Sequence, residues 1–531
     1  MMKNSHFAVI FAILAFVSMI GIVIHLPDIE TNESSYDKPL PVAPKVENPL
    51  AGIGADYSVG EDFTTHLPIV IIDTGNERPP INTVDIPEEE RRIPIPGVEP
   101  YRYGSIKIIE TGGINTLTDT PSYDSPISMK RRGNMSMGFE KPQYLVKLLT
   151  ESGQDNYLPL LGMGAESEWV LNGSMADKSM IRNYLAYSTA DKFIPMVPDS
   201  EYCEVLYHQN GQFYYEGVYL LLENIRQGPD RVDIPKAKYH DPFPSYIVRR
   251  DRKDDEGIML NTWATANALS SEYLGLIYPS VKSATPDIIE FVTQDISKIE
   301  QILYSDNAFI YATYSEFIDI ESFVDYFLIN EFFANYDAGL HSTFMYKKYN
   351  DKLNIGPVWD FDNGLDNYTE APLAIAVTAF QIHPWFDRLM LDASFLEKLD
   401  GRYAELRRGP LSDTDIVSSI DEITNYLGPA IDREWARWET IYTVYDELKT
   451  YSLVPYEDDD GDILIRDSNE HRFEIYRLKT SITQHAAAIA PYLQVLKDSC
   501  TMRTGMENVM GLFLITALLC FAVPAFMSAR T

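Results

Sequence analysis

The spacing of apolar residues changes near residue 285, from the pattern of strands to that of helices. Before this point, β-branched and aromatic runs predict strands, and Asn210-Gly211 separates the apolar runs 204–207 and 212–223. Asn-Gly between two such runs is the strongest short-range indication of a β-hairpin. Apolar residues then recur at helical intervals over residues 287–304, 318–335, 385–407, 412–438 and 471–496. The sequence therefore predicts an α+β fold with a β-rich N-terminal part and a helical C-terminal part.

Two apolar segments flank this region. Residues 7–24 and 509–527 contain almost no polar side chains, and the second segment is long enough to cross a bilayer. The first is typical of a secretory signal or an uncleaved anchor, and the second of a transmembrane segment or a lipid-anchor signal. Lys3 and Arg530 lie outside both segments, so the positive-inside rule places both termini in the cytoplasm. We therefore expect a membrane protein whose large domain is extracytoplasmic.

Proline is frequent before residue 100, which indicates extended, spacer-like chain at the start of the protein. The buried-strand pattern at residues 67–73 places the beginning of the globular domain near residue 62. The expected organisation is residues 1–30 as signal or anchor, 31–61 as a Pro-rich linker, 62–500 as the globular domain and 508–529 as a transmembrane segment.

The chain is strongly acidic. It has 44 Lys and Arg against 78 Asp and Glu, which gives a formal net charge of −34. Such a chain is repelled by nucleic acid and by anionic lipid headgroups, so neither is expected as a binding partner. A basic protein or peptide substrate, or divalent cations, would suit this charge better.

Three aspartates have the spacing of a metal-dependent site. Asp360 and Asp362 leave the end of a short predicted strand at residues 353–360, and Asp337 follows the apolar helical stretch 318–336. Mg²⁺ prefers oxygen ligands and is often held by one or two carboxylates together with phosphate oxygens. One carboxylate that accepts a proton, beside others that hold a metal, is what phosphoryl transfer requires. A solvated Asp-rich turn is the alternative that the pattern leaves open.

A turn that contains glycine precedes a strand that carries lysines. Gly133 and Asn134 tolerate the backbone angles that let a loop approach phosphate groups. Lys141 and Lys147 lie beside or on the following strand, where an ammonium group could meet phosphate oxygens. An ordinary hairpin with solvated lysines would give the same pattern.

Several motifs then occur in a characteristic order. They are Arg-Gly-Asn-x-Ser at 132–136, Asp-Lys-Ser-x-Ile-Arg-Asn at 177–183, Gly-Val-Tyr-Leu-Leu-x-Glu at 217–223, Asp337, and Trp-Asp-Phe-Asp at 359–362. Over roughly residues 62–500 the chain thereby resembles the CotH family, the spore-coat protein H-like atypical protein kinases. The resemblance implies a divergent protein kinase-like fold. It also implies transfer of the γ-phosphate of ATP to Ser or Thr hydroxyls of a protein, with Mg²⁺ or Mn²⁺.

The resemblance implies roles for the three aspartates. Asp337 resembles the catalytic aspartate that accepts the proton of the substrate hydroxyl. Asp360 resembles the metal-binding aspartate, and Asp362 resembles an additional ligand of the metal or of its surroundings.

It also implies the residues that bind the nucleotide. Arg132 and Ser136 would belong to the nucleotide loop, and Glu223 would lie near the adenine edge. Either Lys141 or Lys147 would contact the phosphates, and both remain candidates.

The chain departs from the family pattern at one position. Protein kinases place an Asn five residues after the catalytic Asp to bind a second metal ion, and the family has a His-Asn pair there. Here the pair is His341-Ser342, and a serine hydroxyl is a poorer metal ligand than an amide oxygen. A non-catalytic cell-surface binding protein on the same fold is therefore an alternative. A metal-dependent hydrolase is a further one, although the chain has only nine His.

Overall fold

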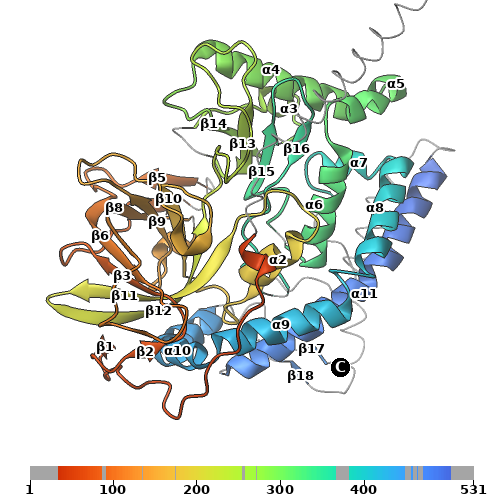
Figure 1. The fold of residues 1–531 in the computed structure, drawn as a ribbon. Coiled ribbons are helices and arrows are strands. Elements are labelled where there is room, and N and C mark those ends of the chain that lie inside the picture. The colour runs from red at the N-terminus through yellow and green to blue at the C-terminus, as the bar shows by residue number, and fades with distance from the viewer. Residues whose placement is uncertain are drawn as a thin grey trace, which may run out of the picture.

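The computed structural model describes residues 34–86, 91–133, 135–173, 175–253, 257–270, 272–335, 337–365, 367, 382–448, 456–457, 463–464 and 470–503. Strands of the N-terminal half form one side of the molecule, and the C-terminal helices form the other side and the base (Figure 1).

Seven strands form a closed sheet in which every strand has a partner on each side. Their order is β12, β10, β9, β8, β6, β3, β11, and β11 pairs again with β12. The β3–β11 pairing is parallel, whereas the β11–β12 pairing is antiparallel. The strands are β3 (Ile69–Asp73), β6 (Arg102–Ile109), β8 (Tyr123–Arg131), β9 (Tyr144–Leu148), β10 (Glu168–Asn172), β11 (Ser200–Gln209) and β12 (Gln212–Glu223), with β1 (Ser58–Val59) added along β12.

The predicted hairpin at Asn210-Gly211 is confirmed. Gln209 pairs with Gln212, so the connection has two residues. Asn210 and Gly211 have φ angles of +54° and +77°. Two successive positive φ angles match the right-handed twist of the flanking strands, and Asn and Gly adopt them at little cost.

A second sheet of four strands lies next to the closed one. Its order is β14 (Tyr273–Tyr278), β13 (Tyr246–Asp251), β15 (Thr343–Lys347) and β16 (Leu353–Ile355). Strand β15 falls in the region predicted to be mainly helical. Four of its five residues are buried, and a short run that is buried on both faces shows no alternation that would distinguish it from a helix.

Helices occupy all five segments that the sequence predicts to be helical after residue 285. Two of these segments are divided, and the break at residue 428 has a local cause. Gly428 has a φ of +45° and precedes Pro429, which begins the next helix. The helices are α4 (Pro286–Leu303), α6 (Ile320–Phe332), α7 (Phe386–Leu389), α8 (Ala393–Leu406), α9 (Asp413–Leu427), α10 (Pro429–Leu448) and α11 (His471–Arg503).

Helix α2 (Arg182–Ala190) lies before this region and begins within the Asp-Lys-Ser-x-Ile-Arg-Asn motif. The remaining helical elements are η1 (Ser35–Asp37), η3 (Met135–Gly138), η4 (Leu160–Gly162), α3 (Thr262–Ala266), α5 (Ala308–Tyr311) and η5 (Ala312–Glu316). The remaining strands are β2 (Thr64–Thr65), β4 (Thr83–Ile86), β5 (Arg91–Pro94), β7 (Asn115–Thr116), β17 (Tyr456–Glu457) and β18 (Ile463–Leu464).

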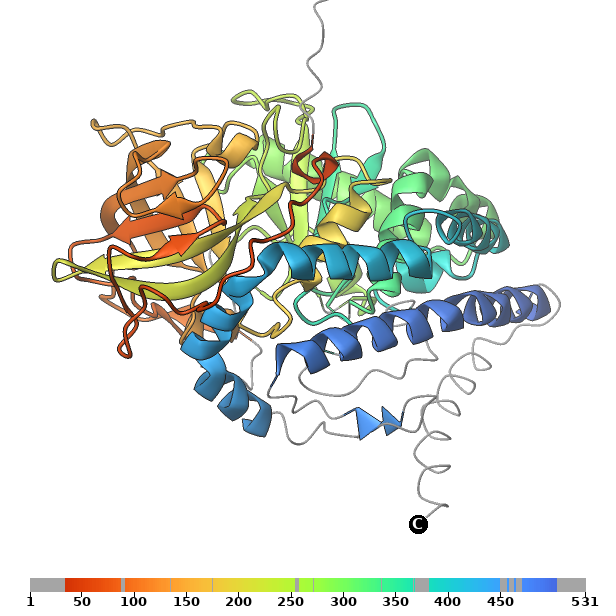
Figure 2. The same ribbon diagram turned by 60° about the horizontal axis from the view of Figure 1, so that its bottom comes forward.

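Two large apolar clusters stabilise these layers. One cluster draws residues from all seven strands of the closed sheet and includes the fully buried Trp169. The larger cluster joins α2, the second sheet and the C-terminal helices, and it includes Tyr187, Trp359 and Phe361. Helix α10 runs beneath the closed sheet, and α11 packs against α6, α8 and α9 (Figure 2). The larger cluster therefore brings α2 and α11 to the chain around residue 360.

The α+β class is confirmed, but the expected divergent protein kinase-like fold is wrong. The β-rich part is a closed seven-stranded sheet, and a separate four-stranded sheet takes its strands from both sides of α4 and α6. The motifs behind that expectation constrain turns around single side chains. They do not specify the order in which strands pair.

The expected membrane segments and membrane localisation are also corrected. Among the helices of the described chain, none is both long enough and apolar enough to span a membrane. Residues 7–24 and 509–527, on which that expectation was based, lie outside the described residues.

Part of the segment predicted to be a linker contacts the domain. The Tyr36 hydroxyl donates to Pro198 O over 2.8 Å, and the Ala43 amide donates to Asn425 O over 3.1 Å. These contacts lie in the described part of residues 31–61, which begins at Ser34.

Candidate functional site

The candidate site lies where three chain segments end near one another. Asp337 follows α6, and Asp360 follows β16. Asp251 is the last residue of β13, whose neighbour β15 pairs with β16. Both Asp337 and Asp251 raise the pKa of Asp360 by their charge. The fold thus gathers the carboxylates that the sequence places far apart.

Hydrogen bonds to its backbone hold Asp360 in place. Its φ is +64°, and its amide donates to the Tyr187 hydroxyl over 3.1 Å. Its carbonyl accepts a hydrogen bond from Asn335 Nδ2 over 3.1 Å. Burial, and after it the neighbouring charge of Asp337, raise the pKa of Asp360 to about 6 against the opposing charge of Arg132. An aspartate held at positive φ among other carboxylates is costly, and such strain is typical of functional positions.

Asp362 is buried beside α2. Its Oδ1 accepts a short hydrogen bond from Asn183 Nδ2, and Asn183 Oδ1 accepts one from the Phe361 amide over 2.7 Å. Burial raises the pKa of Asp362 well above its usual range, and the charge of Asp360 adds to this shift. Asn183 therefore fixes both the side chain of Asp362 and the backbone before it.

Asp337 is half-buried and faces the turn that follows Asp362. Its Oδ2 accepts a hydrogen bond from Asn363 Nδ2 over 2.9 Å. Its carbonyl accepts one from the His341 amide over 2.7 Å, which closes the loop after α6. The Asp337 carboxylate is thus oriented from the segment that carries the other two aspartates.

Arg132 is the predicted nucleotide-loop residue that faces the aspartates. Its guanidinium lies 5.3 Å from the centroid of the Trp359 ring and donates to Gln143 Oε1 over 3.1 Å. Burial lowers the pKa of Arg132, while the charge of Asp360 opposes that shift. The turn also requires a glycine at Gly133, which has a φ of +98°, because an added Cβ would lie 1.9 Å from Ser136 Oγ. Ser136 therefore packs against the backbone of this turn.

Two residues of β13 were missed by the sequence analysis. Asp251 is 8% exposed and pairs with Arg249 Nε over 3.2 Å. Arg249 lies near enough to Arg132 for its charge to lower the pKa of Arg132. A buried-strand run that ends in a carboxylate is the same signal that identifies Asp360, and it could have identified Asp251.

Ser342 stands where the resemblance to the family implies an asparagine. Its Oγ donates to Asp360 Oδ2 over 3.3 Å. Asn363 brings an amide to Asp337 from a different part of the chain. An amide is therefore present at the site although the expected position lacks one.

The two candidate lysines each have a carboxylate partner of their own. Lys147 is partly exposed and pairs with Asp155 over 2.8 Å. Lys141 is fully buried, and its Nζ donates to Val218 O and to Glu434 Oε1, both over 2.6 Å. Burial lowers the pKa of Lys141, and the charge of Glu434 opposes this shift. Lys141 thus joins β12 to helix α10.

We expect the Lys141–Glu434 pair to be a large contributor to stability. The substitution Lys141→Met should lower the free energy of unfolding by about 3–5 kcal/mol, because it leaves a buried carboxylate without its counterion. Urea unfolding of the variant beside Lys147→Met would measure this, since the second change removes only a partly exposed pair. Equal stability of the Lys141→Met variant and the wild type would contradict a structural role and leave Lys141 as a phosphate ligand.

Glu223 borders a separate pocket of about 210 Å³. Arg231 pairs with Glu223 there, and Asn224, Asp199 and Pro357 also line the pocket. Burial raises the pKa of Glu223 to about 8 against the opposing charge of Arg231. Pro357 precedes Asp360 by three residues, so the pocket adjoins the segment that leads to the aspartates, although no predicted aspartate lines it.

A buried histidine supports the loop that carries Asp337. His383 Nδ1 donates to Ala338 O over 2.7 Å, and burial lowers the pKa of His383 from 6.5 to about 4. The folded state thus favours the neutral ring. The contribution of His383 to the free energy of unfolding is complete above pH 6.5. It is lost as the pH falls from 6.5 towards 4, because the histidine of the unfolded chain binds the proton first.

The lowered pKa of His383 predicts how the stability of the protein depends on pH. When the pH is lowered from 7 to 5, the free energy of unfolding of the wild type should fall by about 2 kcal/mol more than that of the His383→Asn variant. The variant keeps a donor near the position of Nδ1 but does not titrate. Urea unfolding of both proteins at the two pH values tests this, and an identical pH dependence would refute it.

The donors at the site fit a hard divalent cation that arrives with phosphate. Within the described ranges, no three His, Cys, Asp or Glu side chains lie together as a metal site. Mg²⁺ often takes only one or two carboxylates from the protein and completes its shell with water and phosphate oxygens. Asp360 and Asp362 are such donors, and the negative charge crowded around Asp360 is what a cation would relieve. The residues present therefore suit Mg²⁺ or Mn²⁺ bound with a nucleotide.

Comparison with known proteins identifies the family. A family model described as CotH kinase protein matches residues 129–453, which is more than half of the chain. The matched segment contains Arg132, Asp337, Asp360 and Asp362. A search of curated proteins found no match. The resemblance deduced from the motifs is thus confirmed, and the chain belongs to the CotH kinase protein family.

Proposed function

We propose that this protein is a kinase that transfers the γ-phosphoryl group of ATP to a Ser or Thr hydroxyl of another protein. The observation that carries the proposal is the convergence of Asp337 and Asp360. Their charges interact strongly enough to raise the pKa of Asp360, and Arg132 faces the same carboxylate. A carboxylate free to accept a proton, next to a carboxylate that suits a cation, is the arrangement phosphoryl transfer requires.

In this proposal each residue has a separate task. Asp337 accepts the proton of the acceptor hydroxyl as its oxygen forms the new bond to the γ-phosphorus. The bond from the γ-phosphorus to the bridging oxygen breaks, and ADP leaves. Asp360 and Asp362 would hold Mg²⁺ or Mn²⁺, which when bound neutralises charge on the phosphate oxygens.

Arg132 supplies the protein cation at the phosphates. Its guanidinium lies near enough to Asp360 for the two charges to interact, and it is supported by Trp359 and Gln143. A guanidinium binds phosphate oxygens in a fixed planar geometry and keeps its charge at every physiological pH. This assignment suits Arg132 better than Lys141, whose ammonium group is engaged by Glu434.

The acceptor is proposed to be a basic or Ser-rich protein. A net charge of −34 favours encounter with a basic polypeptide over an acidic one. Nucleic acid is not proposed as a partner, for the same reason.

The test is phosphoryl transfer by the full chain. The purified protein is incubated with γ-labelled ATP, Mg²⁺ or Mn²⁺, and a basic Ser-rich polypeptide. We expect label on the polypeptide or on the protein itself, and its loss when EDTA is added. A folded protein that neither binds ATP nor transfers label with either metal would overturn the proposal and favour the non-catalytic binding protein.

A further inference from the structure

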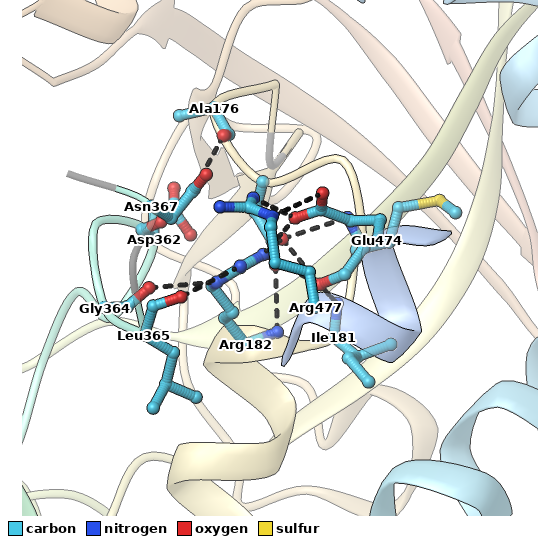
Figure 3. Close-up of polar contacts among 12 residues, drawn as sticks. Ala176, Ile181, Arg182, Asp362, Gly364, Leu365, Asn367, Glu474 and Arg477 are labelled. Carbon is cyan, nitrogen blue, oxygen red and sulfur yellow. Dashed lines mark hydrogen bonds and ion pairs between the residues drawn. The ribbon is translucent and has the colours of Figure 1, made fainter. Parts of the chain in front are cut away.

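A buried arginine connects the metal-binding turn to the C-terminal helix. Arg182, the first residue of α2, has 0% exposure. Its Nε donates to Gly364 O over 3.0 Å, and its Nη2 donates to Leu365 O over 3.3 Å (Figure 3). Both carbonyls belong to the turn that directly follows Asp362. Arg182 therefore fixes the backbone of this turn at two successive residues.

The charge of Arg182 is balanced from two directions. Its Nη1 makes a short ion pair with Asp177 and a second ion pair with Glu474 Oε1 over 3.0 Å. Glu474 lies in the first turn of α11 and is itself bound by Arg477 Nη2 over 2.6 Å (Figure 3). Both Arg182 and Glu474 have 0% exposure, so neither charge is screened by solvent.

The next residue of α2 acts on the same turn. Asn183 binds the Asp362 carboxylate and the Phe361 amide. On the other side, Asn367 Nδ2 donates to Asp362 O over 2.6 Å and to Ala176 O over 2.8 Å. Asp362 thus lies in a short segment whose backbone is bound before, at and after it.

We propose that Arg182 and Glu474 are positioning residues for the metal site, so that the start of α11 belongs to the site. Glu474 orients the guanidinium of Arg182, and Arg182 holds the turn that presents Asp362. The inference rests on the proposed function, because it concerns the cation that Asp360 and Asp362 would bind. The family match ends at residue 453, and α11 begins at His471, so Glu474 acts from outside the matched segment.

A merely structural ion pair would stabilise the fold without changing affinity for a cation. The Arg182 contacts predict more than this, because two of its donors end on carbonyls of the turn and only Nη1 is used by the carboxylates. Residues that orient metal ligands typically change metal affinity by about 10- to 100-fold when they are mutated.

The experiment is Mn²⁺ binding by the full chain, measured by electron paramagnetic resonance in the presence of a non-hydrolysable ATP analogue. The variant is Glu474→Gln, which keeps the shape of the side chain and removes its charge. We expect Mn²⁺ affinity to fall about 10- to 100-fold. The matched control is Glu204→Gln, because Glu204 is also fully buried and pairs with Arg433 over 2.6 Å. The control should be destabilised but should bind Mn²⁺ as the wild type does.

Each outcome decides between the two proposals. Wild-type affinity in the Glu474→Gln variant overturns the inference and leaves the proposed function intact. Absence of Mn²⁺ binding by the wild type overturns the proposed function itself. Equal losses of affinity in the Glu474→Gln and Glu204→Gln variants would assign the effect to general destabilisation and also refute the inference. If Glu474→Gln does not fold, Arg182→Lys replaces it, since it keeps the charge but cannot reach both carbonyls, and the same loss is expected.

Discussion

Replacing Asp360 with asparagine is expected to reduce phosphoryl transfer by about 10³-fold or more, since loss of even one electrostatic contact to a transition state costs about 10²–10³ in rate. The change removes the charge through which a cation would be held. It also removes one of several crowded carboxylates, because the charges of Asp337 and Asp251 both act on Asp360. The free energy of unfolding should therefore stay the same or increase, as is typical of residues kept for function rather than for stability.

Two measurements on the same samples test this expectation. Label transfer from ATP gives the rate, and urea unfolding gives the stability. Asp351→Asn is a suitable control, because Asp351 is exposed in the connection between β15 and β16. Activity within tenfold of the wild type in the Asp360→Asn variant would exclude Asp360 as an essential metal ligand.

The second large effect is expected at Asp337. Asp337→Asn should lower kcat by about 10²–10⁴-fold, which is the usual contribution of a general base. Affinity for ATP should remain within about twofold of the wild type. The reason is that the Asp337 carboxylate is oriented by Asn363 and faces the site without being one of the proposed metal ligands.

Transfer kinetics and equilibrium binding of a fluorescent ATP analogue separate the two quantities. Loss of nucleotide binding together with activity would mean that Asp337 supports the site structurally. An unchanged kcat would remove it from the mechanism. If nucleotide binding is lost together with activity, the next residue to test is Asp251, the other carboxylate whose charge acts on Asp360.

The sequence predicts the fold where the information is local. The Asn210-Gly211 turn specifies its hairpin, and helical periodicity identifies α4, α6 and α11. Closure of the sheet could not be predicted in this way. It depends on the parallel pairing of Ile69–Asp73 with a strand that begins more than a hundred residues later, and no local pattern encodes that pairing.

The candidate site, too, could be predicted from sequence only where the information is local. Asp337, Asp360 and Asp362 are recognisable because each ends an apolar run with a carboxylate, and their roles remain predictions. Lys141 and Lys147 could not be told apart from sequence, because the difference lies in their partners. Glu434 is contributed by α10, nearly three hundred residues after Lys141, whereas Asp155 lies close to Lys147 in sequence.

The origin of these counterions has a consequence for biosynthesis. Lys141 and Arg182 lie in the first half of the chain, but Glu434 and Glu474 lie near its end. A nascent chain that has emerged only as far as β16 would have to bury Lys141 without Glu434 and Arg182 without Glu474, although Asp177 would still pair with Arg182. Removing one partner of a buried ion pair is strongly destabilising. We therefore expect productive folding to begin only after α10 and the start of α11 have left the ribosome. Premature termination before Glu474 should yield a chain that is degraded rather than a smaller working domain.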